Sequence, residues 1–187
     1  MALPVLTTSR LRLTPADPAD AVAVLRYSLD NQAHLAPWEP LRGADFFTEA
    51  DCRQRLLLAQ AAGAAGQAAH YFLRPLAQPG IVMGNASLSA IQRGPAQFCF
   101  LGYGLAAGAE GLGYMHEALT PLVAWAFSGL KLHRIMANYL PRNERSGRLL
   151  ARLGFVKEGL AKRYLRINGV WEDHVLTSLT NENWRDG

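Results

Sequence analysis

The middle of the chain alternates apolar strands with helices, and this order limits its possible folds more than any other feature. An apolar run over residues 96–105 (AQFCFLGYGL) ends in a Gly-rich turn. The helix predicted over 111–130 follows, with its apolar residues at helical spacing. Another strand is predicted over 133–140, then a helix over about 144–153. This β-α-β-α order favours a mixed sheet with helices on both faces.

The remaining segments add strands and helices on either side of this unit. Residues 34–43 contain Pro37 and Pro40, which forbid a continuous helix, so this segment is expected to be a loop. The other elements are predicted from local patterns: strands over 11–16, 70–75, 81–91, 162–167 and 172–180, and helices over 17–31 and 48–69. The sequence therefore predicts an α/β fold whose mixed sheet has about seven strands.

Composition excludes several classes of protein. Half of the 187 residues are hydrophobic and 18% are charged, which is typical of a globular chain. We expect no membrane span, because there is no long apolar run, and the first residues do not resemble a signal peptide. Two cysteines are too few for a disulfide framework, which favours a reducing, cytoplasmic location. No residue spacing suggests a metal site.

The formal net charge of +4 is compatible with an anionic cofactor or an RNA-rich neighbourhood, and it proves neither. We expect no direct DNA binding.

The Gly-rich turn before residue 114 is a candidate anion site. Gly111 and Gly113 allow close approach to the backbone, and the start of the following helix offers free N–H groups. A pyrophosphate would fit there, although a tight turn without a ligand would give the same pattern. The pattern is neither a P-loop nor a dinucleotide fingerprint, because His116 stands where that fingerprint requires glycine.

A second candidate is NERSGRLLARLGF, which follows the strand over 133–140. Asn143 can cap the helix, and Ser146 lies in its first turn near the edge of the sheet. Both residues could be present only to satisfy N–H groups at the helix start.

Together, LGYGL…EGLGYMHEA and NERSGRLLARLGF resemble the GNAT superfamily of acetyltransferases. In that superfamily an A motif, Q/R-x-x-G-x-G/A, precedes a B motif, N-x-x-S/A…LGF. Five other segments resemble ribosomal-protein-alanine N-acetyltransferases of the RimJ/RimL type, above all the RimJ group: SRLRL, HLAPWEP, FFTEAD, HRIMANYLPRNERSGRLLARLGFVKEG and YLRINGVWEDHVLTSLT. The resemblance covers residues 9–180, which we expect to form a single GNAT domain with a splayed fourth strand.

The resemblance also implies roles for individual residues. Acetyl-CoA is expected on two segments and two helix-start residues: Gly102, Tyr103, Gly104 and Leu105; Glu110, Gly111, Leu112, Gly113, Tyr114 and Met115; Asn143 and Ser146. Ser146 resembles the general acid that protonates the leaving thiolate, and a backbone N–H near Tyr103 would stabilise the oxyanion. Two positions depart from the family pattern: Gly108 replaces Gln or Arg, and Leu150 replaces the tyrosine acid of many members.

The resemblance implies an acceptor as well, namely the N-terminal amine of a ribosomal protein whose first residue is alanine. Trp38 and Glu39 are expected to form one wall of the acceptor site, and the turn before WEDH the other. Glu39, Asp173 and His174 are candidate bases or amine contacts. Alternatively, Trp38 only packs, Glu39 is solvated, and Asp173 and His174 only join the last strands.

Two other functions stay open. One is a GNAT enzyme that acetylates a small amine, and the other is a ribosome- or RNA-associated protein that keeps the fold with little catalysis. The chain is expected to be a monomer or a homodimer.

Overall fold

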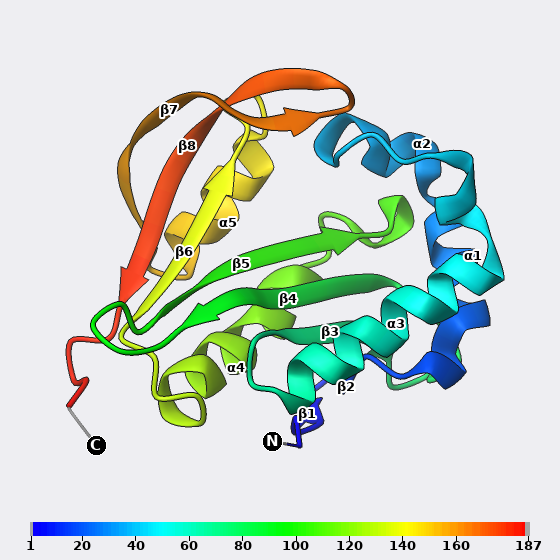
Figure 1. Ribbon diagram of the computed structural model, residues 1–187, viewed down its shortest axis with the longest axis horizontal. Helices are drawn as coiled ribbons and strands as arrows, with labels where there is room; N and C mark the ends of the chain where they lie inside the picture. The colour runs from blue at the N-terminus through cyan, green and yellow to red at the C-terminus, as the bar shows by residue number, and fades with distance from the viewer. Residues whose placement is uncertain (1, 186–187) are drawn as a thin grey trace.

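The structure is a computed structural model that describes residues 2–185, and one eight-stranded sheet runs through it (Figure 1). The strand order is β1-β2-β3-β4-β5-β6-β8-β7. The strands are β1 (Leu6–Thr7), β2 (Leu11–Pro15), β3 (Ala69–Pro75), β4 (Gly84–Gln92), β5 (Phe98–Leu105), β6 (Arg134–Tyr139), β7 (Val156–Ile167) and β8 (Val170–Thr180). Among these described strands, β5 and β6 pair in parallel and the other neighbours are antiparallel.

Within residues 2–185, five α-helices and four short 3₁₀ helices connect the strands. The α-helices are α1 (Ala21–Asp30), α2 (Gln32–Leu35), α3 (Glu49–Ala64), α4 (Tyr114–Ser128) and α5 (Glu144–Arg152). The 3₁₀ helices are η1 (Pro18–Asp20), η2 (Ala36–Trp38), η3 (Ala44–Phe47) and η4 (Ala107–Ala109).

The structure confirms the mixed, mostly antiparallel sheet, with small differences from the sequence-based expectation. The eighth strand is the two-residue β1, which is too short for its side chains to alternate recognisably. The predicted loop over 34–43 contains η2, because Pro37 fits the first turn of a helix even though it excludes a long one. β7 begins six residues before the predicted strand, at Val156, and most of its side chains are exposed.

β5 and β6 diverge, and this divergence places the candidate site. Their pairing covers only Phe98–Phe100 of β5, whereas β5 continues to Leu105 against β4 alone. In Figure 1 the two strands start side by side and then separate. The resulting splay exposes the backbone of the second half of β5, so the predicted splayed strand is confirmed.

Helices cover both faces of the sheet. One core packs α4 and Leu150 of α5 against β2 to β6, and a smaller core packs α1 and α3 on the opposite face around Phe72 of β3. In β3, Tyr71 and Leu73 belong to the first core and Phe72, between them, to the second, as the period of two requires. In the part of the chain that the structure describes, no helix is long and apolar enough to cross a membrane.

Candidate active site

A cleft of about 860 Å³ lies where the splay meets the start of α4 and α5. Ten of the predicted cofactor residues line it: Tyr103, Gly104, Leu105, Glu110, Gly111, Gly113, Tyr114, Met115, Asn143 and Ser146. Gly102 and Leu112, which were also predicted, belong to the same two segments but do not line the cleft. The fold therefore brings together two motifs that are separated by a helix and a strand.

The start of α4 has the form of an anion site. Gly111 and Gly113 have φ of +76° and +80°, a region that glycine adopts without strain. Gly113 is the N-cap of α4, and no side chain caps the helix there. A Cβ on Gly108 or Gly111 would meet nothing within 4 Å, so the loop is open to a ligand. These observations fit a pyrophosphate at the positive end of a 15-residue helix.

The start of α5 positions a pair of hydroxyl groups in the cleft. The Asn143 side chain accepts a hydrogen bond from the Ser146 backbone N–H at 3.1 Å, so Asn143 is a helix cap as well as a cleft residue. The Ser146 hydroxyl lies 2.6 Å from the Tyr103 hydroxyl on β5. Burial raises the pKa of Tyr103 to about 12, against the opposing effect of the Ser146 hydrogen bond. Tyr103 therefore stays protonated at neutral pH.

Sequence reasoning missed this contact between the two side chains, because it gave Tyr103 only a backbone role. The alternation of β5 offers a signal in retrospect. Tyr103 points to the face of the sheet that α4 and α5 cover, whereas Gly102 and Gly104 belong to the opposite face.

Gly147 allows α5 to approach the sheet closely enough for this pairing. A Cβ at this position would lie 2.8 Å from the Tyr139 ring on β6. Because real Cβ atoms do not approach that closely, any other residue here would force the Tyr139 ring or α5 to shift.

Charged side chains surround the mouth of the cleft. Glu110 forms an ion pair with Arg145 of α5, and its other oxygen lies 3.5 Å from the His34 ring of α2. Arg148 and Arg152 also line the cleft from α5. The spacing of these three arginines on α5 places them on one helical face, which sequence reasoning could have used. Their positive charge is complementary to a phosphorylated ligand.

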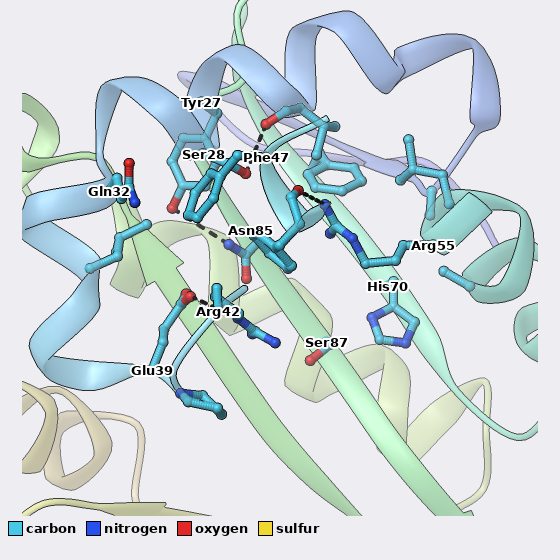
Figure 2. A pocket seen from close by; sticks show the side chains of 18 of the residues that line it. Tyr27, Ser28, Gln32, Glu39, Arg42, Phe47, Arg55, His70, Asn85 and Ser87 are labelled. Carbon is cyan, nitrogen blue, oxygen red and sulfur yellow. Dashed lines mark hydrogen bonds and ion pairs between the residues drawn. The ribbon is translucent and has the colours of Figure 1, made fainter. Parts of the chain in front are cut away.

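A second cavity, of about 610 Å³, lies on the other face of the sheet beneath α1 and α3 (Figure 2). Figure 2 shows Tyr27 from α1, His70 from β3, and Asn85 and Ser87 from β4 around it. Burial lowers the pKa of His70. Two segments that the sequence predicted as walls of the acceptor site contribute to this cavity, through Glu39 and Asn168. Sequence reasoning missed Asn85 and Ser87, although these polar side chains stand at alternate positions of β4 and share one face.

The two cavities approach each other at Gly104 of β5. Leu35 lines both of them. A Cβ on Gly104 would lie 3.3 Å from Asn85 Nδ2 and 3.4 Å from the Tyr27 hydroxyl. Asn85 Nδ2 donates to that hydroxyl at 3.5 Å, and Figure 2 shows the amide oxygen turned away from Tyr27. The missing side chain of Gly104 therefore keeps the space between the cleft and this pair open.

Glu39 lines the second cavity, where its carboxylate lies 3.7 Å from the Arg42 guanidinium. Its backbone carbonyl accepts a hydrogen bond from Asn168 N–H at 2.8 Å. Asn168 and Gly169 form the β7–β8 turn, and both have positive φ, as a two-residue hairpin turn requires. The two segments expected to be opposite walls of the acceptor site are thus in direct contact.

Trp38 lies beside Glu39 in the chain but lines the cofactor cleft, not the second cavity. The Arg142 guanidinium lies 5.7 Å from the Trp38 ring centroid, donates to the Pro37 carbonyl at 3.2 Å and pairs with Glu172 of β8 at 2.8 Å. Arg142 thus links the 36–38 segment, the β7–β8 hairpin and the start of α5.

Asp173 and His174 line neither cavity. Hydrogen bonds from the Lys162 ammonium (2.7 Å) and the Arg163 N–H (2.9 Å) lower the pKa of Asp173, which makes it a weaker base. His174 is buried, and its Nδ1 lies 3.0 Å from the Glu172 carbonyl. The Asp173 contacts join β7 to β8, the His174 contact lies within β8, and none of them places either side chain at the reacting centre.

Comparison with known proteins agrees with this geometry. Residues 10–156 match the family described as the acetyltransferase (GNAT) domain. The chain belongs to the GNAT family. It is 41% identical over 182 residues to the [ribosomal protein uS5]-alanine N-acetyltransferase of Escherichia coli K12. The matched region covers 97% of this chain and 93% of that protein.

Two solved GNAT structures are also similar along almost the whole chain. The ribosomal-protein-S5-alanine acetyltransferase of Vibrio fischeri has a TM-score of 0.94 and 40% identity, covering 98% of this chain and all of that one. RimJ of Mycobacterium smegmatis, in complex with CoA-disulfide, has a TM-score of 0.88 and 29% identity, covering 98% and 90%. This GNAT chain is therefore an N-acetyltransferase, and acetyl-CoA is its co-substrate.

Proposed function

We propose that this N-acetyltransferase acetylates the N-terminal α-amine of a ribosomal protein, with alanine preferred as the first residue. The observation that carries the proposal is the 41% identity, over nearly the full length of both chains, to an enzyme named for that reaction. A second cavity that approaches the cofactor cleft at Gly104 supports it, since an acceptor needs its own route to the thioester.

On the cofactor side, the residues present fit acetyl-CoA. Backbone N–H groups at Gly113 and the start of α4 would hold the pyrophosphate, and the exposed edge of β5 would pair with the pantetheine arm. When bound, acetyl-CoA supplies the acetyl group as an activated thioester. Gly108 contributes no side chain, so backbone groups do most of the phosphate binding in this loop.

On the acceptor side, the second cavity would take the peptide N-terminus. The Glu39 carboxylate would attract the protonated amine, and the Asn85 amide oxygen would accept a hydrogen bond from it. Tyr27 would hold Asn85 in that orientation through its hydroxyl. Because the reacting amine must come within about 3–3.5 Å of the thioester carbon, a small first residue is favoured beside Gly104.

The amine must lose a proton before it attacks. An α-amine has a pKa of about 7.7–8.0, so roughly a tenth is already neutral at pH 7, whereas a lysine at about 10.4 is neutral in about one molecule of a few thousand. An α-amine therefore needs only a weak base, and Glu39, directly or through water, is our candidate. The positions of Asp173 and His174 outside both cavities do not support either as the base.

The hydroxyl pair completes the chemistry. A backbone N–H near Tyr103, on the part of β5 that no longer pairs with β6, would stabilise the oxyanion. Ser146 would donate its proton to the departing thiolate, and Tyr103, 2.6 Å away, would donate its own to Ser146 in turn. The Tyr103 hydroxyl is protonated at neutral pH and has a proton to give, and its raised pKa makes it a weaker acid than a free tyrosine, so the support for this order is the 2.6 Å contact with Ser146.

Residues 9–180 are taken as one acetyltransferase domain, since β2 to β8 all belong to one sheet. We place the enzyme in the cytoplasm, where its proposed acceptors are made.

An acceptor series tests the proposal. Peptides that begin with Ala, Ser or Leu, or with acetyl-Ala, and that each contain one internal lysine, are compared by mass spectrometry after reaction with acetyl-CoA. We expect product from the Ala and Ser peptides, little from Leu, and none from acetyl-Ala. Acetylation of the internal lysine in the blocked peptide, or a strong preference for a free polyamine over every peptide, would contradict the proposal.

A further inference from the structure

The SRLRL segment at the start of the chain has no role in the chemistry above, yet its first residues contact the pyrophosphate loop. The turn between β1 and β2, residues 8–10, lies against the first turn of α4. Three donors meet Glu117 Oε1: the Thr8 hydroxyl at 2.6 Å, the Ser9 hydroxyl at 2.9 Å and the Arg10 N–H at 2.8 Å. Arg10 Nε and Nη2 each lie 2.6 Å from Glu117 Oε2.

This arrangement fixes a negative charge beside the anion site. Burial alone would raise the pKa of Glu117, but the hydrogen bonds from Thr8, Arg10 and Ser9 outweigh it and lower the pKa to about 2. Glu117 is therefore fully ionised at neutral pH. Without a counter-charge, a carboxylate in the first turn of α4 would repel the phosphates that the same helix end is shaped to bind.

Arg10 supplies that counter-charge, and it also contacts Leu112 and Tyr114, the residues on either side of Gly113. Its Nη1 donates to the Leu112 carbonyl at 3.1 Å, and its guanidinium lies 4.2 Å from the Tyr114 ring centroid. Its Nη2 is the nearest atom to a Cβ built on Gly113, at 3.6 Å. Arg10 therefore holds the backbone of the loop from the side while it cancels the charge of Glu117.

We propose that Arg10 is a positioning residue for the pyrophosphate half of acetyl-CoA. Arg10 orders the Leu112–Tyr114 loop and neutralises the charge of Glu117. This role compensates for Gly108, where the family motif has a glutamine or arginine side chain. A planar guanidinium is suited to this role, because the same group contacts the Glu117 carboxylate, the Leu112 carbonyl and the face of the Tyr114 ring.

The test measures ligand binding and so does not depend on the identity of the acceptor. CoA binding is measured by calorimetry, and binding of pantetheine, which lacks the phosphates, by ligand-observed NMR. The variants are Arg10→Gln, Arg10→Lys, Glu117→Gln and the double variant Arg10→Gln/Glu117→Gln. Arg53→Gln, which breaks an exposed 2.7 Å pair with Glu49 on α3, is the matched control.

We expect Arg10→Gln to weaken CoA binding by about tenfold or more, while pantetheine binding and the Arg53→Gln control stay unchanged. Arg10→Lys keeps the charge but not the three contacts, so its CoA affinity should be intermediate. Removing the Glu117 charge from Arg10→Gln should recover the electrostatic part of the loss, so the double variant should bind CoA more tightly than Arg10→Gln and about as well as Arg10→Lys.

Three results would overturn the proposal. One is unchanged CoA affinity in a folded Arg10→Gln variant. Another is an equal loss of pantetheine and CoA binding, which would indicate a general structural effect. The third is failure of the double variant to recover. If Arg10→Gln does not fold, the same comparisons with Arg10→Lys decide the question.

Discussion

At the scale of single residues, the cofactor cleft depends on side chains that do two things at once. Asn143 caps α5 and lines the cleft, and Ser146 sits in the first turn of α5 while its hydroxyl meets Tyr103. The alternative that these residues only satisfy helix N–H groups accounts for Asn143 but leaves the Ser146 hydroxyl without an explanation. The position of that hydroxyl in the cleft makes it the best candidate for the acid.

Replacing Ser146 tests this role. Ser146→Ala should lower kcat by about tenfold to a thousandfold and leave CoA affinity near normal, because a transition-state contact is lost and the cap on the backbone N–H is kept. Steady-state kinetics and calorimetry measure the two effects, and Ser128→Ala, at the end of α4, serves as a control that leaves α5 and both cavities intact. A Michaelis constant that rises while kcat holds would make Ser146 a binding residue.

At the scale of elements, the site forms where secondary structure begins or separates. α4 and α5 both start at the cleft, and β5 leaves β6 there, so free backbone groups from three elements face one space. Local backbone conformation matters most at Gly113, where a positive φ and an uncapped helix start coincide.

Gly113→Val should weaken CoA binding by about tenfold or more, because a branched side chain at positive φ strains the loop and its Cβ would point toward Arg10 Nη2, 3.6 Å away. Gly108→Ala is the matched control, since its φ is not positive and its Cβ would meet nothing within 4 Å. Calorimetry with CoA compares the two variants. Equal affinity of the Val and Ala variants would contradict the placement of the phosphates at Gly113.

At the scale of the whole molecule, contacts between distant segments hold the two cavities in place. The β7–β8 turn bonds to Glu39, and Arg142 links that hairpin to the 36–38 segment. On the opposite side, Glu117 ties the β1–β2 turn to α4 across 107 positions of sequence. Ion pairs of this kind make stability depend on pH.

The contribution of Glu117 has a definite sign. Its folded pKa of about 2 lies below the ordinary value of 4.5, so the stabilisation is complete above pH 4.5 and is lost as pH falls toward 2. Glu117→Gln should therefore have a lower free energy of unfolding than the original chain at pH 7. The difference in free energy between the two chains should shrink as pH falls from 4.5 toward 2. Urea unfolding at several pH values measures this difference, and a difference that does not change with pH would rule out the charge of Glu117 as its cause.

The sequence by itself determined the order of strands and helices, the turn at Gly111–Gly113 and the helix cap at Asn143. Periodicity and turn chemistry are local properties, and a few neighbouring residues are enough to specify them. With the resemblance to a family, the same residues indicated the cofactor and most of the residues that line its cleft. The splay followed from that resemblance and not from the pattern of apolar residues.

Only the tertiary structure decided which distant side chains meet. Tyr103 with Ser146, Arg10 with Glu117, and Gly104 with the Tyr27–Asn85 pair each join separate elements. Periodicity tells which face of an element is buried, but it does not tell which partner lies against that face. For the same reason Asp173 looked like a base in the sequence, whereas packing places it on an exposed hairpin beside Lys162.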